Sequence, residues 1–303
     1  MSASSSYTST FVHSYDKYWD YLWKTITHPI TSDGFINGFY VLIFASLLIW
    51  GLEILIPWRK KQKTFRKDFW LDAFYMFFNF YIFNLLLYAA MSNVSLKAFY
   101  ALLSPLGIHK GQHLIDIHAI GLHWALELLI FFLIADFIQW CVHNALHRIP
   151  FLWKFHKIHH SVKEMGFAAH LRYHFLETFA YQAVKYISLS MIFGFTLQNA
   201  FIVYTLTVII GHLNHANLNW DYGPLKYFFN NPKMHIWHHS KELPAEHSKG
   251  MNFGISLSVW DYIFGTAYVP SSGRDIELGF PNDEQFPDSF VGQVIEPFKP
   301  EKS

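Results

Sequence analysis

Long apolar stretches alternate with polar segments along this chain. The first stretch, residues 36–57, has about the 20 residues that a helix needs to cross the hydrocarbon core of a membrane. A cluster of lysines and arginines at 59–67 follows it, and a second apolar stretch occupies 69–90. Because basic residues favour the cytoplasmic side, these two stretches predict a hairpin of spans whose turn lies in the cytoplasm.

The remaining apolar pattern predicts one more long span, at 122–141, and a short hydrophobic hairpin, at 178–211 with a break at 194–198. Counting the crossings places residues 143–174 and 212–247 together on the cytoplasmic side. We therefore expect an all-α fold. It would be an integral membrane helical bundle with about three long spans and the short hairpin, carrying a cytoplasmic, histidine-rich helical cap.

The same pattern divides the chain into four parts. A polar, interfacial N-terminal segment at 1–35 precedes transmembrane helices at 36–142. A histidine-rich catalytic region at 143–270 contains the membrane hairpin. Residues 271–303 form a polar C-terminal tail that we expect to be exposed.

Composition supports a membrane protein and excludes several other classes. Hydrophobic residues make up 52% of the chain and charged residues 15%, whereas a typical soluble domain has about 25% charged residues. The formal net charge is +1 with no basic stripe, which excludes a nucleic-acid partner on electrostatic grounds. The single cysteine, Cys141, excludes a disulfide within the chain and sites built from several cysteines.

Histidine is the residue type that points to chemistry, with 19 copies in an apolar chain. On a helix, residues three and four positions apart share one face, so imidazoles at this spacing can bind one metal or bridge two. Three segments have it: His143 with His147, then His156 with His159 and His160, and finally His235 with His238 and His239. Two further pairs are His170 with His174 and His212 with His215. His109, His113, His118 and His123 fall at the opposite end of the third span, away from this set.

The number of candidate ligands predicts two metal ions. A structural zinc site needs four ligands, whereas about nine or ten are present here. Imidazole suits iron, zinc, copper and nickel, and an all-histidine set beside a membrane favours iron and O2 chemistry. Three acidic residues are candidates to hydrogen-bond the ligand rings from behind. They are Asp136, which precedes His143 by two helical turns, Glu177, which follows His174, and Asp261.

Over residues 126–270 the chain resembles the sterol desaturase / fatty acid hydroxylase superfamily. The segments that carry the resemblance, in chain order, are His143-Asn-Ala-Leu-His147, His156-Lys-Ile-His159-His160, Arg172-Tyr-His174-Phe-Leu-Glu177, His215-Ala-Asn217, Met234-His235-Ile-Trp-His238-His239, Asn252-Phe-Gly and Trp260-Asp-Tyr-Ile-Phe-Gly265-Thr266. The resemblance implies a membrane enzyme with a cytoplasm-facing di-iron site that takes O2 as co-substrate. Such an enzyme hydroxylates, desaturates or demethylates a lipid, with electrons from a redox partner.

Carried over residue by residue, the resemblance implies nine iron ligands: His143, His147, His156, His159, His160, His215, His235, His238 and His239. Two residues compete for a tenth place. His212 lies three positions before His215 and reaches the same metal if that stretch is helical. His174 lies in the family's Arg-x-His-Pro-x-Glu segment, where Phe175 here replaces the usual proline.

The expected function is therefore O2-dependent hydroxylation or desaturation of a lipid such as a sterol or a fatty-acyl chain. Its electrons would come from a separate donor, a cytochrome b5-like or ferredoxin-like reductase system. One alternative is a pterin-dependent ether-lipid monooxygenase. An alternative of another class is a metal transporter or sensor, which would distribute histidines and acids through its spans instead of gathering them at one face.

Overall fold

The computed structural model describes residues 6–30, 36–79, 121–178 and 197–300, with single residues and short stretches between 94 and 120 and between 181 and 193. Within them every regular element is a helix, and only isolated β-bridges occur. The α-helices are α1 Tyr7–Thr27, α2 Gly38–Leu55, α3 Phe69–Phe77, α5 Trp124–Arg148, α6 Pro150–His160, α8 Leu197–His215, α9 Pro232–His238, α10 Val259–Ile263 and α11 Phe290–Ile295. Short 3-10 turns are η3 Ser104–Leu106, η5 Phe167–Leu171, η6 Gly223–Tyr227, η7 Ala245–His247, η8 Asp283–Gln285 and η9 Glu296–Phe298. The predicted all-helical class is confirmed.

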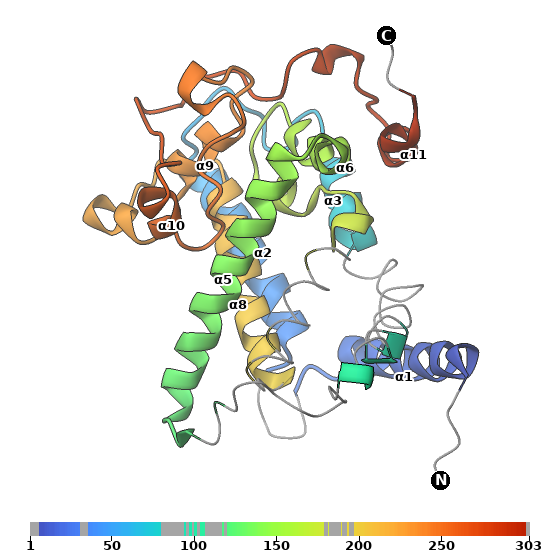
Figure 1. Ribbon diagram of the computed structural model, residues 1–303. Coiled ribbons are helices and arrows are strands. Elements are labelled where there is room, and N and C mark those ends of the chain that lie inside the picture. The colour runs from blue at the N-terminus through green and yellow to red at the C-terminus, as the bar shows by residue number, and fades with distance from the viewer. Residues whose placement is uncertain are drawn as a thin grey trace.

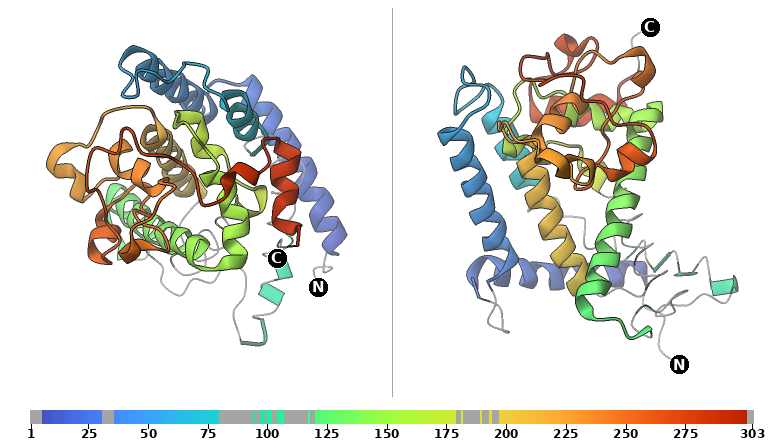
Figure 2. Two further views of the ribbon diagram at one scale, coloured as in Figure 1. Left: turned by 90° about the horizontal axis from the view of Figure 1, so that it is seen from above. Right: turned by 90° about the vertical axis from the view of Figure 1, so that its left-hand side faces the viewer.

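Three long helices form the stem of the molecule. Figures 1 and 2 show α2, α5 and α8 running side by side, with α6, α9, α10 and the segments that follow them gathered at one end as a cap. At the opposite end α1 lies across the stem. The stem therefore delivers the C-terminal ends of α5 and α8 to the cap, where the histidines are.

Two of the helices in the described part of the chain, α2 and α5, are long and apolar enough to cross a membrane. Their apolar side chains point outward as well as inward. On α2, for example, Phe44 is 69% exposed. The second predicted span, 69–90, begins as α3, and its residues 80–90 lie outside the described residues, as does much of the hairpin at 178–211. The second arm of that hairpin forms the 19-residue α8, longer than expected because the helix continues to His215.

The break between α5 and α6 follows from local sequence. Pro150 occupies the first turn of α6, where its missing N–H costs nothing, and the preceding Ile149 is extended.

At the other end of α5, the imidazole of His123 accepts a hydrogen bond from the backbone N–H of Ala125 at 3.3 Å. His123 and His143 are twenty residues apart on one helix, so about 30 Å separates them. The far-side histidine is thus remote from the others.

Buried apolar clusters hold the cap on the stem. One joins α5 to α8 through Phe131, Ala135 and Val203. A second brings together Ile49 of α2, Phe167 of η5 and, among others, Phe69, Ala216 and Leu218. A third lies inside the cap and contains Val162, Met165, Ala169, Ile236 and Leu278. These contacts join segments that are far apart in sequence.

A buried network of charged side chains joins α3 to the segment after η5. The guanidinium of Arg172 lies 3.0 Å from Asp68 and 3.2 Å from Asp72, and Asp72 also pairs with Arg66. Arg172 is 2% exposed and Asp72 is fully buried. Buried charges of this kind are tolerated only when each has an opposite charge beside it.

The C-terminal residues 271–300 do not form the exposed tail that we expected. The ring of Phe290 packs against Phe74, Tyr75 and Phe78, and the amide oxygen of Gln293 accepts a hydrogen bond from the Tyr75 hydroxyl at 3.0 Å. The segment is polar in composition, but Phe290 and Gln293 contact α3, and Phe280 and Phe298 contact the α6 residues Trp153 and Phe155. Hydropathy averaged over the segment did not reveal this contact.

Candidate metal centre

Nine of the histidines that the sequence singled out gather into two groups of imidazoles in the cap. Within each group the candidate ligand nitrogens all lie within 4.8 Å of one another. Group 1 consists of His143, His147, His156, His160 and His238. Group 2 consists of His159, His215, His235 and His239. The structure thus brings together all nine histidines expected as firm ligands.

Helix geometry explains how the segments divide between the groups. On α6, His156 and His160 are four residues apart, share a face and join group 1, whereas His159 points to group 2. The α9 segment does the reverse, because its ends, His235 and His239, join group 2 and His238 joins group 1. The two groups adjoin, since the rings of His160 and His239 stack with centroids 4.5 Å apart.

The ring nitrogens inside each group are as close as ligands of a common ion. In group 1, Nε2 of His143 lies 3.2 Å from Nε2 of His156. In group 2, Nε2 of His215 lies 2.9 Å from that of His235 and 3.2 Å from that of His159. Neighbouring donors that bind one ion at about 2.1 Å are roughly 3.0–3.4 Å apart, which matches these contacts.

Hydrogen bonds behind the rings orient their lone pairs toward the groups. Nδ1 of His143 lies 2.7 Å from the Phe253 carbonyl oxygen, and Nδ1 of His215 lies 2.7 Å from the Gly211 carbonyl oxygen. Nδ1 of His159 faces the Arg172 oxygen at 3.2 Å, and Nδ1 of His238 faces the Met251 oxygen at 2.8 Å. A neutral imidazole that donates from Nδ1 keeps an unprotonated Nε2, the form that binds a metal.

Several buried nitrogens at the centre have no hydrogen-bond partner among the described residues. They are Nε2 of His147, His160 and His238 and Nδ1 of His239. Buried polar atoms without a partner are rare and costly, and a metal ion is one partner that satisfies several of them at once. The donor set and its unpaired atoms therefore fit a pair of metal ions.

Burial also keeps these rings neutral. Desolvation lowers the pKa of His159 to about 3, and it lowers the pKa values of His156, His160, His235 and His239 well below the ordinary value. An imidazole with a lowered pKa remains unprotonated at neutral pH. Protons therefore do not compete with a metal ion for these nitrogens at pH 7.

Of the three acids proposed to support the ligands, Glu177 contacts a ligand ring directly. Its carboxylate lies 2.8 Å from Nδ1 of His156, and both side chains are buried. Desolvation raises the pKa of Glu177 to about 8. A positive charge on a metal bound by His156 would favour the ionised carboxylate of Glu177. The ionised carboxylate would in turn accept the hydrogen bond from Nδ1 of His156 more strongly.

Asp136 and Asp261 act on the backbone next to the site. Asp136 of α5 accepts hydrogen bonds from the amides of Ser256 and Leu257, at 3.2 Å each, and from the indole of Trp260. Asp136 thus joins α5 to the 256–260 segment. The spacing had suggested a hydrogen bond to His143 on the same helix, whereas these contacts are with residues far away in sequence.

Asp261 holds the loop that contacts His143. It accepts from the amides of Phe253 and Gly254 at 2.8 Å each, from Trp140 at 2.9 Å and from Thr266 at 2.6 Å. Since the Phe253 carbonyl oxygen faces His143, Asp261 supports a ligand through the backbone.

The two residues that competed for a tenth place lie outside both groups. Nδ1 of His212 lies 3.1 Å from the Phe167 carbonyl oxygen. His174 uses both ring nitrogens elsewhere: Nε2 lies 3.1 Å from the Val294 oxygen, and Nδ1 accepts from the Leu176 amide at 3.1 Å.

The part of the chain that carries both histidine groups is similar to a known protein family. Residues 128–266 match the family model described as fatty acid hydroxylase. Residues 128–266 thus form a domain of the sterol desaturase / fatty acid hydroxylase superfamily. The match spans α5 to α10, and it includes every histidine of groups 1 and 2.

Among similar proteins, ornithine lipid hydroxylase OlsE of Rhizobium tropici is 31% identical over 174 residues, which cover 57% of this chain and 51% of that protein. Alkylglycerol monooxygenase of Danio rerio is 27% identical over 145 residues, 48% of this chain and 31% of that protein. A very-long-chain aldehyde decarbonylase of Oryza sativa subsp. japonica is 24% identical over 174 residues, 55% of this chain and 53% of that protein. The chain thus spans at most about half the length of these relatives. No solved structure matches it at a significant level.

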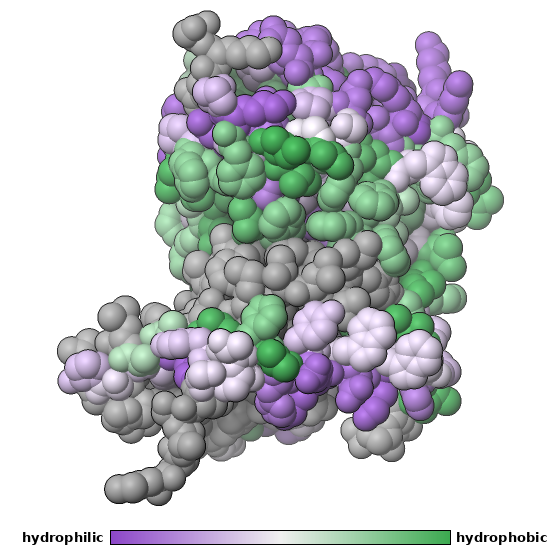
Figure 3. Space-filling view, turned by 90° about the vertical axis from the view of Figure 1, so that its right-hand side faces the viewer, coloured by the Kyte–Doolittle hydropathy of each residue, from purple (hydrophilic) through white to green (hydrophobic). Residues whose placement is uncertain are grey.

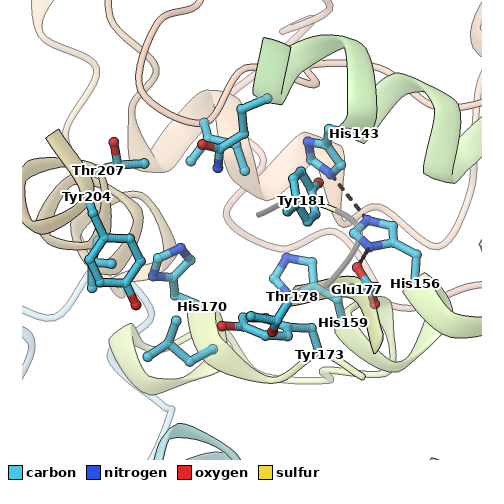
Figure 4. Close-up of a pocket in the computed structure, with 14 residues that line it drawn as sticks. His143, His156, His159, His170, Tyr173, Glu177, Thr178, Tyr181, Tyr204 and Thr207 are labelled. Atoms are coloured by element: carbon cyan, nitrogen blue, oxygen red, sulfur yellow. Dashed lines mark hydrogen bonds and ion pairs between the residues drawn. The ribbon is translucent and has the colours of Figure 1, made fainter. Parts of the chain in front are cut away.

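In this fatty acid hydroxylase domain a cavity of about 110 Å³ opens beside the two histidine groups. His143, His156 and His159 line one side of it, as Figure 4 shows. Residues that we did not single out from the sequence as site residues line the rest, among them Gln139, His170, Tyr173, Thr178, Tyr181, Tyr204 and Thr207. The only sequence signal for any of them was the spacing of His170 to His174. Tyr173 lies within the Arg172–Glu177 segment that carries the resemblance, whereas Tyr181, Tyr204 and Thr207 come from apolar stretches where nothing distinguishes them.

Replacing Glu177 of the hydroxylase domain with alanine is expected to weaken metal binding about 10–100-fold, because His156 loses the carboxylate that orients its ring. Glu177→Gln should retain part of the affinity, since an amide oxygen still accepts from Nδ1. The measurement is metal content of the purified full chain after competition with a chelator. Glu246→Gln, at an exposed position, is the matched control. Unchanged affinity in Glu177→Ala would show that this contact does not support the centre.

Proposed function

We propose that this protein is a membrane oxygenase that holds two iron ions in groups 1 and 2 and uses O2 to hydroxylate or desaturate a lipid. One observation carries the proposal: nine histidines, eight of them buried and one half-buried, form two adjoining donor groups beside a cavity, at the cap end of two apolar helices. Its named relatives include an ornithine lipid hydroxylase and an alkylglycerol monooxygenase, which supports a lipid as the substrate.

The surface supports a cap that rests on the bilayer. Figure 3 shows hydrophobic side chains gathered in a band below a hydrophilic top. Large apolar side chains of the cap itself are exposed, including Phe151 at 65%, Phe228 at 58% and Ile263 at 62%. Exposed apolar side chains next to spanning helices are expected to meet lipid. We infer a multi-pass protein whose polar cap faces the cytoplasm, where the electron donor, of cytochrome b5 or ferredoxin type, would dock.

The residues of the chain have three tasks in this mechanism. His143, His156 and His159 face the cavity and are also members of the metal-binding groups, so a substrate carbon in the cavity lies next to the ions. Iron bound there would supply the reduction of O2 that oxidation of an unactivated C–H bond requires. The hydroxyls of Tyr181 and Thr207, also in the cavity wall, can hydrogen-bond a polar part of the lipid and orient it.

The enclosing helices exclude water from the reacting atoms. Trp140 and Asp261 seal the cap against α5 through a buried 2.9 Å hydrogen bond, and the indole of Trp140 stacks on Phe264. A dry site of this kind prevents loss of reactive oxygen species to solvent.

The experiment is metal analysis and O2 uptake by the full chain purified in detergent. We expect about two iron ions per chain, and O2 uptake that requires both a reductant and a lipid extract. Product analysis of the extract then identifies the lipid. Stoichiometric zinc without O2 uptake under any reductant would refute the proposal. Transport of metal across the membrane of liposomes that contain the protein, without oxidation of lipid, would instead indicate a transporter.

A second candidate is a pterin-dependent ether-lipid monooxygenase, favoured by the similarity to alkylglycerol monooxygenase. The choice of reductant distinguishes the two. Uptake of O2 with a reduced pterin and an alkylglycerol, in the absence of a protein electron donor, would favour this candidate.

A further inference from the structure

The two histidine groups differ in the number of imidazoles that a long stem helix contributes to each. Helix α5 delivers two imidazoles one turn apart, His143 and His147, to group 1. Helix α8 delivers His215 to group 2, but the position one turn earlier is Gly211. Residues four apart lie on one helical face, so a side chain at 211 would point toward group 2 as His143 and His147 point toward group 1. Group 2 consequently has four members and group 1 has five.

Another imidazole fills the space that Gly211 leaves open. A Cβ atom placed at Gly211 would lie 2.2 Å from both Cε1 and Nε2 of His170. The ring of His170 thus stands where a side chain of residue 211 would begin, and its centroid is 5.1 Å from that of His215. His170 comes from η5 and borders the same cavity as His159, as Figure 4 shows. Glycine at 211 is what allows this approach.

His212 lies beside His170 and can support it as a ligand that binds a metal through Nε2. Nδ1 of His212 lies 3.3 Å from Nδ1 of His170, so His212 can accept the proton that a metal-bound His170 carries on Nδ1. The same His212 nitrogen also lies 3.1 Å from the Phe167 oxygen. His212 donates to that oxygen only in the tautomer that carries its proton on Nδ1. Metal binding at His170 would select the other tautomer, in which Nδ1 of His212 accepts from His170 and the hydrogen bond to Phe167 is lost.

We propose that His170, inserted beside Gly211, is the tenth histidine ligand and gives the group 2 ion a fifth imidazole. His212 orients it, and His174 has no part in the centre because both of its ring nitrogens are bonded elsewhere. The proposal rests on the proposed function only in requiring that two metal ions bind. It does not depend on which metal or which lipid is used.

The test is metal content and affinity of the full chain in detergent, measured by elemental analysis after chelator competition. His170→Ala should weaken the second ion about 100-fold or more, leaving about one ion per chain under competition. Gly211→Ala should do the same, because its Cβ displaces the His170 ring. The decisive variant is His170→Ala combined with Gly211→His, which recreates on α8 the pair of histidines one turn apart that α5 carries. It should restore the second ion.

Controls separate a lost ligand from a lost fold. His174→Ala should keep both ions, and His212→Ala should weaken the second ion less than His170→Ala does. In protein loaded with Co2+, the visible absorption should change on His170→Ala, because the intensity of these bands reports coordination number. Two tightly bound ions in His170→Ala, or no recovery in the double variant together with an unchanged Co2+ spectrum, would overturn the proposal. Wild-type protein that binds two zinc ions and consumes no O2 would refute the proposed function and leave this test valid.

Discussion

Replacing His159 with alanine is expected to abolish lipid oxidation and to reduce bound metal from about two ions per chain to about one. His159 is buried, belongs to group 2, and lies next to His160 of group 1 at the junction of the groups. Its ring centroid is 5.0 Å from that of His215 and 4.6 Å from that of His239. Removing it takes one of the donors from the second ion and opens a space beside the cavity.

Activity in the His159→Ala protein is measured as product in lipid extracts of cells that express it, and metal by elemental analysis of the purified protein. His247→Ala is the matched control, because His247 belongs to neither group and its ring packs beside Tyr268. It should keep both metal and activity. A His159→Ala protein with both ions and undiminished product would exclude His159 from the centre.

Replacing Arg172 with methionine is expected to lower the free energy of unfolding by about 3 kcal/mol, since it takes the cation from the half-buried Asp68 and one of two cations from the fully buried Asp72. Arg172 pairs with Asp68 and Asp72, and among the described residues only Asp72 retains another cationic partner, Arg66. The backbone oxygen of Arg172 also faces Nδ1 of His159. Metal affinity should therefore fall together with stability.

Unfolding of the Arg172→Met protein in detergent, followed by circular dichroism against added denaturing detergent, measures the loss. Arg274→Met is the matched control, because Arg274 pairs with Asp275 at the exposed surface, where an ion pair contributes little. Equal stability of the two variants would show that the buried network does not hold α3 to the cap.

Much of this architecture could be read from local pattern. Apolar runs predicted α2 and α5 because a span needs about 20 apolar residues whatever surrounds it. The spacing of His156, His159 and His160 predicted shared ligands because an α-helix brings residues three and four apart to one side. Both rules depend only on residues within one helix, so they can be applied to the sequence directly.

The assignment of histidines to groups depended on packing instead. Nothing local indicates that His159 leaves its neighbours to join His215, 56 residues away, with Nε2 atoms 3.2 Å apart. The partners of Asp136 are likewise 120 residues or more distant. Such contacts arise only when α5, α6, α8 and α9 pack around one point. The spacing of residues along the sequence does not indicate the angle at which two helices pack.

His170 and Gly211 show the limit most clearly. In the sequence, His170 is paired only with His174, and Gly211 is a glycine within an apolar run. Their meaning comes from a contact across 41 positions that only the fold creates, because a Cβ atom added at Gly211 would lie 2.2 Å from the His170 ring. The kind of donor in the candidate site, the imidazole, follows from composition and spacing, because residue type determines which metals a site suits. The number of donors for each ion, and which residue completes the set, follows from tertiary structure, because shape determines which nitrogens meet.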